Sequence, residues 1–159
     1  MKPNVLIGVA CTALAASTIS FHSSAIADTD ACALLTTAQV SAAVGFPVAT
    51  GTHVTPTFLK TCTWTGSNST GAQFVTLNLQ TGTFFDGAKK QANIATAAGA
   101  VMKPGGVGDD SYYLIQGTQV MLWVKKGNGA FKVAVYKQIS ADQKEGMELT
   151  LAKEVIPKL

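Results

Sequence analysis

The sequence contains no arginine, and its 12 basic side chains other than histidine are all lysines. The planar guanidinium of arginine is the group suited to clamping a phosphate or carboxylate through two parallel hydrogen bonds. Nine acidic side chains leave a net charge of only +3. Proteins that bind nucleic acids concentrate more positive charge than this on one face. We therefore expect no nucleic-acid partner and no bidentate anion clamp.

Histidine is almost as scarce, because the chain has only His22 and His53. His22 lies in an N-terminal segment with the layout of a cleaved signal peptide. Once that segment is removed, His53 is the only histidine. A zinc site with several histidine ligands is then excluded, and any Ser-His-Asp triad would have to use His53. His53 lies in the stretch "ATGTHVTPT", which carries no nucleophile signature. We interpret it as an ordinary surface or strand histidine.

Paired carboxylates offer no better route to catalysis. Glu145 and Glu148 lie on neighbouring turns of an expected helix, and we expect both to face solvent. Hydrolysis by two carboxylates requires them to face each other across a cleft. The sequence therefore predicts a protein that is not an enzyme, with no catalytic residue, no cofactor and no metal.

Residues 1–27 predict export. Lys2 precedes an uncharged stretch that begins at Val5, and Ala25 and Ala27 place small side chains before the expected cleavage site. Cleavage before Asp28 would leave 159 − 27 = 132 residues, which we expect to form one domain, residues 28–159, without a transmembrane segment. An uncleaved anchor and lipidation at Cys11 are the alternatives, but the apolar run is shorter than the roughly 20 residues of a spanning helix.

Two cysteines, Cys32 and Cys62, remain after that cleavage. An even pair in an exported protein predicts a disulfide bond, because oxidising compartments favour it. A reactive or metal-binding pair is the alternative, but the sequence offers neither a nearby histidine nor a C-x-x-C spacing.

Residue patterns predict an α+β domain with an antiparallel sheet flanked by helices. A capping box at Thr36 and Gln39 places the first helix start at Thr37, and Thr83 and Ser140 mark the starts of two more. Alternating apolar residues predict strands over residues 60–65 and 75–79 and a three-strand meander over residues 112–136. The order is helix, strands, helix, meander, helix.

The stretch "PGGVGDDSYY" resembles a ligand-binding loop at first sight. A phosphate loop requires a following helix with lysine and serine or threonine, whereas this stretch leads through two aspartates into a strand. Calcium loops require a D-x-D-x-D-G spacing that is missing. We therefore interpret it as a structural turn, formed by these residues: Gly105, Gly106, Gly108, Asp109 and Asp110.

The strand over residues 120–125 is apolar on both faces, and it carries the candidate binding surface. Met121 and Trp123 alternate with the aliphatic residues and join Tyr112 or Tyr113 of the preceding strand. Aromatic anchors and an adaptable methionine suit a binding surface. The alternative is that helices cover both faces of the sheet and that Trp123 is core.

The stretches "CALLTTAQV", "CTW", "GVGDDSYY" and "VKKGNGAFKVAV" together resemble a group of secreted bacterial domains of unknown function, many of them lipoproteins, with a PsbP-like fold. The resemblance implies an antiparallel sheet flanked by helices and a role as a binding or accessory protein of the cell envelope. We expect a non-enzymatic secreted or periplasmic protein that recognises a protein or an apolar small molecule. An envelope inhibitor or immunity protein that plugs a hydrolase is the second hypothesis, and an enzyme the third.

Overall fold

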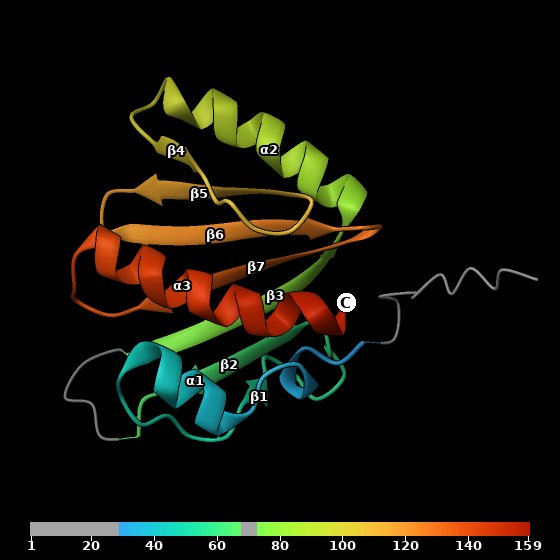
Figure 1. The fold of residues 1–159 in the computed structure, drawn as a ribbon, viewed down its shortest axis with the longest axis vertical. Helices are drawn as coiled ribbons and strands as arrows, with labels where there is room; N and C mark the ends of the chain where they lie inside the picture. Colours follow the sequence, from blue (N-terminus) through green and yellow to red (C-terminus); the bar gives the residue numbers. More distant parts are fainter. Residues whose placement is uncertain (1–28, 68–72) are drawn as a thin grey trace, which may run out of the picture.

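The structure, a computed structural model, describes residues 29–67 and 73–159. Its centre is a seven-stranded sheet in the order β1-β2-β3-β7-β6-β5-β4, in which every neighbouring pair is antiparallel (Figure 1). The strands are β1 Thr52–His53, β2 Thr61–Thr65, β3 Phe74–Thr81, β4 Val101–Pro104, β5 Asp110–Gln116, β6 Gln119–Lys126 and β7 Gly129–Tyr136. The helices are α1 Thr37–Val44, α2 Gly82–Thr96 and α3 Ala141–Val155, with short 3-10 turns at Ala31–Ala33 (η2) and Ile156–Lys158 (η3). The predicted α+β class is confirmed.

One face of the sheet, which we call the inner face, carries the main core beneath α1 and α3 (Figure 1). Its strand residues are fully or almost fully buried: Cys62, Trp64, Val75, Leu77, Leu79, Leu122, Val124, Phe131, Val133 and Val135. From the helices, Val40, Val44, Leu151 and Val155 pack against them. Alternation of side chains along a strand places all of these residues on one side.

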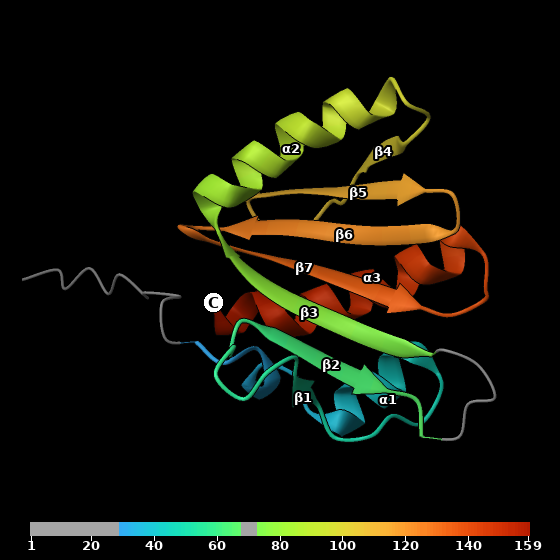
Figure 2. The same cartoon turned by 180° about the vertical axis from the view of Figure 1, so that it is seen from behind.

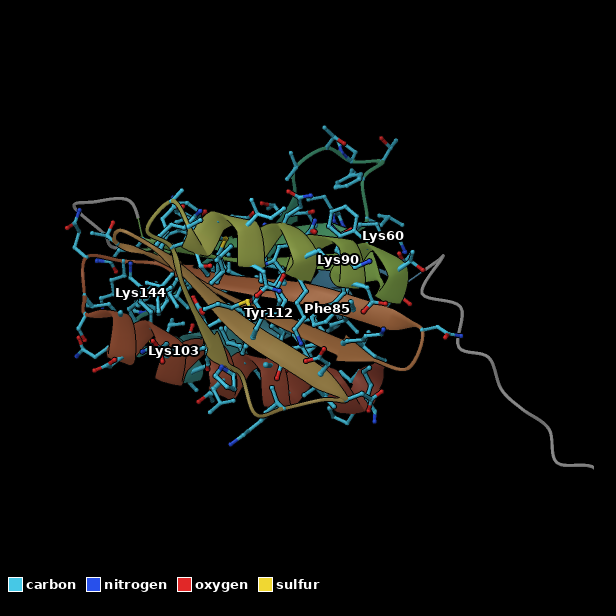
Figure 3. All side chains as sticks on the ribbon, turned by 90° about the horizontal axis from the view of Figure 1, so that it is seen from above. Lys60, Phe85, Lys90, Lys103, Tyr112 and Lys144 are labelled. Atoms are coloured by element: carbon cyan, nitrogen blue, oxygen red, sulfur yellow. A yellow bond between two sulfur atoms is a disulfide. The ribbon has the colours of Figure 1, made fainter. Side chains whose placement is uncertain are left out.

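The opposite face, which we call the outer face, is only partly covered. Figure 2 shows α2 beside β4 and β5, and among the described residues no helix crosses β2 and β3 on this side. The contact under α2 is a small second core, where Phe85 packs against Tyr112 and Ala130 (Figure 3). Among the described residues, the outer face of β2 and β3 is therefore the least covered part of the sheet, whereas Ala130 and Ala134 on the outer face of β7 are buried.

The predicted helix starts are confirmed at two of three positions. Thr36 and Gln39 form the expected capping box of α1, and Ser140 and Gln143 form that of α3. The start of α2 at Thr83 is wrong: the N-cap is Thr81, whose hydroxyl accepts the hydrogen bond from the Phe84 amide, and the helix begins at Gly82. The sequence "TGT" offers two threonines as caps, and the buried Gly82, whose amide donates to the Asn128 backbone oxygen at 2.8 Å, lies directly after the first of them.

The sheet has more strands than the sequence patterns indicate. The meander gains β4, whose Val101 and Lys103 pair with β5, and the opposite edge gains the two-residue strand β1. Strands this short carry too few residues for an alternating pattern to be detected. Tertiary pairing with a longer neighbour is what makes them strands.

The predicted disulfide is confirmed, with 5.0 Å between the Cα atoms of Cys32 and Cys62. It links η2 to β2 and so attaches the N-terminal part of the described chain to the sheet. The expected signal peptide lies outside the described residues. Across residues 29–67 and 73–159, none of the helices combines the length and the apolar character needed to cross a bilayer.

Candidate functional site

Three of the four residues predicted as a binding surface lie together on the outer face. Tyr112 is the cross-strand partner of Trp123, and Met121 lies two residues from Trp123 on the same side of β6. Tyr113 lies on the inner face instead, where it is buried and its hydroxyl donates to the backbone oxygen of Glu145 at 2.9 Å. The register therefore selects Tyr112 as the neighbour of Trp123.

Trp123 lies in a stack of three aromatic rings. The ring centroids of Tyr112 and Trp123 are 6.0 Å apart, and Phe84 of α2 lies 6.2 Å from Trp123. Trp123 is partly buried, whereas Phe84 is 52% exposed. The indole Nε1 of Trp123 and the hydroxyl of Tyr112 are buried without a hydrogen-bond partner among the described residues. Phe84 is the ring that this stack presents to solvent.

Lys132 lies beside this stack on β7. Its Nζ is 5.3 Å from the centroid of the Trp123 ring, which is a favourable cation–π position. Burial lowers the pKa of Lys132, and within the described parts of the chain its ammonium group forms no ion pair. Two other lysines near this face, Lys89 and Lys125, each pair with an aspartate. Lys132 is therefore a partly desolvated cation to which the described residues offer no paired anion.

Uncharged polar side chains continue from Lys132 across the outer face. Asn78 is the cross-strand partner of both Thr61 and Lys132. Its Nδ2 donates to the Thr61 hydroxyl, and its Oδ1 accepts from Gln80 Nε2. We call Asn78, Phe84, Trp123 and Lys132 the outer-face site: an exposed ring, a cation and an amide on adjoining elements.

The glycines of "PGGVGDDSYY" meet backbone requirements. Gly106 and Gly108 have φ angles of +70° and +68°, which glycine adopts without strain. A Cβ on Gly105 would lie 2.6 Å from the Ser111 hydroxyl oxygen, and one on Gly108 would lie 2.6 Å from a backbone carbonyl oxygen. The loop has the geometry of a close-packed turn leading into β5.

The two aspartates of that turn are both engaged by lysines. Asp109 accepts from Lys126 Nζ at 2.8 Å and from the Gly127 amide at 2.6 Å, and the Lys126 hydrogen bond is the main cause that lowers the pKa of Asp109. Asp110 accepts from Lys89 Nζ through both oxygens. These contacts support the interpretation of the loop as a structural turn.

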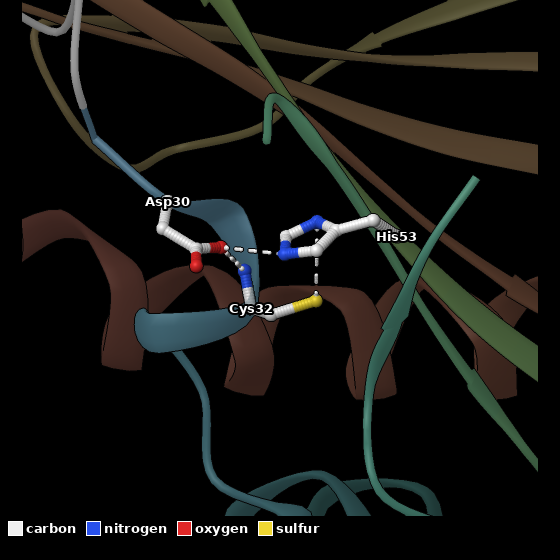
Figure 4. Close-up of side chains that lie close together, drawn as sticks. All are labelled: Asp30, Cys32 and His53. Atoms are coloured by element: carbon white, nitrogen blue, oxygen red, sulfur yellow. Dashed lines mark hydrogen bonds and ion pairs between the residues drawn. The ribbon is translucent and has the colours of Figure 1, made fainter. Parts of the chain in front are cut away.

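The structure gathers a cluster that the sequence separates: Asp30, Cys32 and His53 (Figure 4). His53 Nε2 lies 3.3 Å from Asp30 Oδ1, and His53 Nδ1 lies 3.6 Å from Cys32 Sγ. The sequence argument that no histidine lies near the cysteines is wrong for the folded protein, in which His53 lies beside both of them. The disulfide brings Cys32 to Cys62, and His53 is the cross-strand partner of Cys62.

Glu148 is the second residue whose environment the sequence misplaced. It is fully buried on the inner side of α3, and its Oε1 accepts from the Val135 amide at 2.9 Å. The ladder between β6 and β7 stops at the pair Leu122 and Val133, so Val135 has no partner on β6. The carboxyl group replaces the missing strand partner, and burial raises its pKa to about 8.

A pocket of about 390 Å³ lies where β6 and β7 separate. Its wall includes the stacked rings of Phe74 and Tyr136, whose centroids are 4.2 Å apart. Lys144 also lines it, but its Nζ donates to the Thr118 backbone oxygen at 2.5 Å. Lys137 lines the pocket as well, with its Nζ 4.9 Å from the Phe46 ring centroid. The pocket therefore has an aromatic wall and two lysines, whereas the outer-face site combines an exposed ring with a lysine whose pKa is lowered by burial.

No protein-family model, curated protein or solved structure matches the chain.

Proposed function

We propose that this chain is a non-enzymatic binding or accessory protein of the cell envelope, secreted or periplasmic, with a PsbP-like fold, that takes its ligand at the outer-face site. The disulfide between Cys32 and Cys62 fits an oxidising compartment. The outer face of β2 and β3, which none of the described helices crosses, fits a role in which a partner or ligand covers it.

The unpaired Lys132 is the observation that carries this proposal. A partly buried lysine has lost part of its hydration, and a nearby anion would compensate for that loss. Phe84 offers an exposed ring that stacks on Trp123, and Asn78 is the cross-strand partner of Lys132 on β3. The ligand that fits this site has a carboxylate or sulfate group next to an apolar face. The sequence led us to expect an apolar molecule, and the site adds the requirement that this molecule carry a negative charge.

Replacing Lys132 by methionine is expected to raise the dissociation constant for 8-anilinonaphthalene-1-sulfonate, an aromatic sulfonate, at least about tenfold, because a charge-assisted contact contributes about 1.5–3 kcal/mol. Phe84→Ala is expected to weaken binding several-fold through the lost ring. Lys90→Met, at an exposed position of α2, is the matched control (Figure 3). Fluorescence titration of the folded variants measures all three constants.

Trp123 provides a second readout for the same test. In a Trp64→Phe background it is the only tryptophan, and its emission is expected to become less accessible to acrylamide when the sulfonate binds. Equal dissociation constants for Lys132→Met and Lys90→Met, with no change in quenching, would contradict binding at this site.

A second candidate function is inhibition of a hydrolase, and the loop between β1 and β2 favours it. Val54, Phe58 and Leu59 are 68%, 48% and 40% exposed. Figure 3 shows this loop, which ends near Lys60, rising on the side of the sheet that also carries α2. The Leu59 oxygen accepts from the Ala31 amide at 2.8 Å, close to the disulfide. An exposed apolar loop with a fixed base suits insertion into a cleft.

Phe58→Ala combined with Leu59→Ala is expected to abolish capture of a hydrolase from periplasmic extract if the inhibitor hypothesis is correct, because both apolar side chains that enter the cleft are lost. Lys132→Met should leave the same capture unchanged. Affinity purification with mass spectrometry, followed by an activity assay of the captured enzyme with added protein, measures this. A captured hydrolase whose activity is unaffected would contradict inhibition.

A further inference from the structure

The pocket where β6 and β7 separate has the size of a small-molecule site. Its volume is about 390 Å³, and ligand pockets in proteins usually measure about 300–1,000 Å³. Phe74 and Tyr136 form one wall as cross-strand partners on β3 and β7, with their rings stacked at an interplanar angle of 15°. Both side chains are half-buried, and each ring keeps one face that its stacking partner does not cover. This wall suits contact with a flat apolar group.

Two lysines line the same pocket without a carboxylate partner. Lys144 of α3 is only 5% exposed, and its Nζ donates one hydrogen bond, to the Thr118 backbone oxygen. An ammonium group carries three N–H donors, so two remain. Lys137 lies directly after β7 and contacts Phe46 through a cation–π interaction. Within residues 29–67 and 73–159, neither lysine forms an ion pair.

The acidic side chains of α3 do not neutralise Lys144. Glu148 lies about one helical turn away, but burial raises the pKa of its carboxyl group to about 8, so this group is mostly protonated at pH 7. Glu145 pairs with Lys103 of β4 at 2.8 Å. Asp142, with a side chain 92% exposed, lies 3.9 Å from the same lysine. Lys144 is therefore a buried cation whose charge is left for a ligand to compensate.

We propose that this pocket is a second binding site, separate from the outer-face site, for a small aromatic carboxylate. The ring of the ligand packs against Phe74 and Tyr136, and its carboxylate accepts charge-assisted hydrogen bonds from Lys144. Lys137, which also lines the pocket, adds a second positive charge. Tyr136 lies four residues beyond Lys132 on β7, which is roughly 13 Å along the strand. A ligand of two fused rings therefore occupies one site only.

Calorimetric titration of the disulfide-bonded protein with 2-naphthoate at pH 7 tests the proposal. The titration uses the Lys132→Met variant, which lacks the cation of the outer-face site, so the result does not depend on the function proposed above. We expect saturable binding of one molecule. The amide 2-naphthamide has the same shape without the charge, and it should bind at least about tenfold more weakly.

Substitutions of the two lysines remove the charge and keep an apolar side chain of similar length. In the same background, Lys144→Met should weaken binding of 2-naphthoate at least about tenfold, because it removes the charge-assisted contact. Lys137→Met should weaken it by a smaller factor. Lys153→Met, at an exposed position of the helix that carries Lys144, is the matched control and should leave the affinity unchanged.

Nuclear Overhauser contacts locate the ligand without any substitution in the pocket. The chain has three tyrosines, of which Tyr112 and Tyr113 are buried. In protein with labelled tyrosines, the naphthoate protons should therefore show contacts to the Tyr136 ring alone. No saturable binding, equal affinity for 2-naphthoate and 2-naphthamide, or bound naphthoate without contacts to Tyr136 would overturn the pocket as a site.

Discussion

The parent protein is expected to lose stability as the pH rises from about 4.5 to 8, and replacing Glu148 by glutamine is expected to abolish most of this loss. The buried carboxyl group has a pKa of about 8, against 4.5 in an exposed glutamate. Between these values the folded protein holds a proton that the unfolded chain releases, so the free energy of unfolding falls as the pH rises. Desolvation is the main cause of the shift, and the Val135 hydrogen bond opposes it.

The size of this effect is large for one residue. The separation of the two pKa values corresponds to at most about 5 kcal/mol, and water penetration on ionisation would reduce it. Glutamine keeps an oxygen that accepts from the Val135 amide, so the opening between β6 and β7 stays capped. The variant should be more stable than the parent at pH 8 and similar to it at pH 5.

Urea unfolding at pH 5 and pH 8 measures this prediction. Glu154→Gln is the matched control, because Glu154 lies on the same helix with its side chain exposed. It should leave the pH dependence of the parent unchanged. The prediction is contradicted if the free energy of unfolding falls by the same amount between pH 5 and pH 8 in Glu148→Gln and in Glu154→Gln.

Loss of the disulfide is expected to lower the free energy of unfolding by about 3–4 kcal/mol. The bond joins residues 30 positions apart, and a loop of this length restricts the unfolded chain by about that amount. Cys62 is fully buried in the main core, so Cys62→Ala also removes sulfur contacts. The double variant Cys32→Ala, Cys62→Ala should therefore be less stable than the loop entropy alone predicts.

Denaturant unfolding of three samples separates these two contributions: oxidised protein, protein reduced without mutation, and the double alanine variant. Reduction breaks the cross-link and keeps both sulfurs, so the difference between the reduced protein and the variant reports the packing. A reduced protein that unfolds within about 1 kcal/mol of the oxidised one would contradict the stabilising role of the bond.

Local sequence determined the starts of α1 and α3 and the faces of the long strands. The capping boxes at Thr36 and Ser140 depend on side chains three residues apart, so they act before any tertiary contact forms. Period-two alternation placed Cys62 and Trp64 on the buried side of β2 in the same way. The disulfide followed from the cysteine count and the expected compartment. These features depend on few residues and on no distant partner.

Tertiary structure decided which charged groups are unpaired, buried or brought together. Glu148 is buried because β6 and β7 separate beyond Val133 and leave a backbone amide to be capped. Asp30 and His53 lie together because the disulfide joins Cys32 to Cys62 and strand pairing places His53 opposite Cys62. Whether Lys132 finds an anion depends on the register of β7 between β3 and β6. Electrostatic environment is set by neighbours distant in sequence, and only the folded chain specifies them.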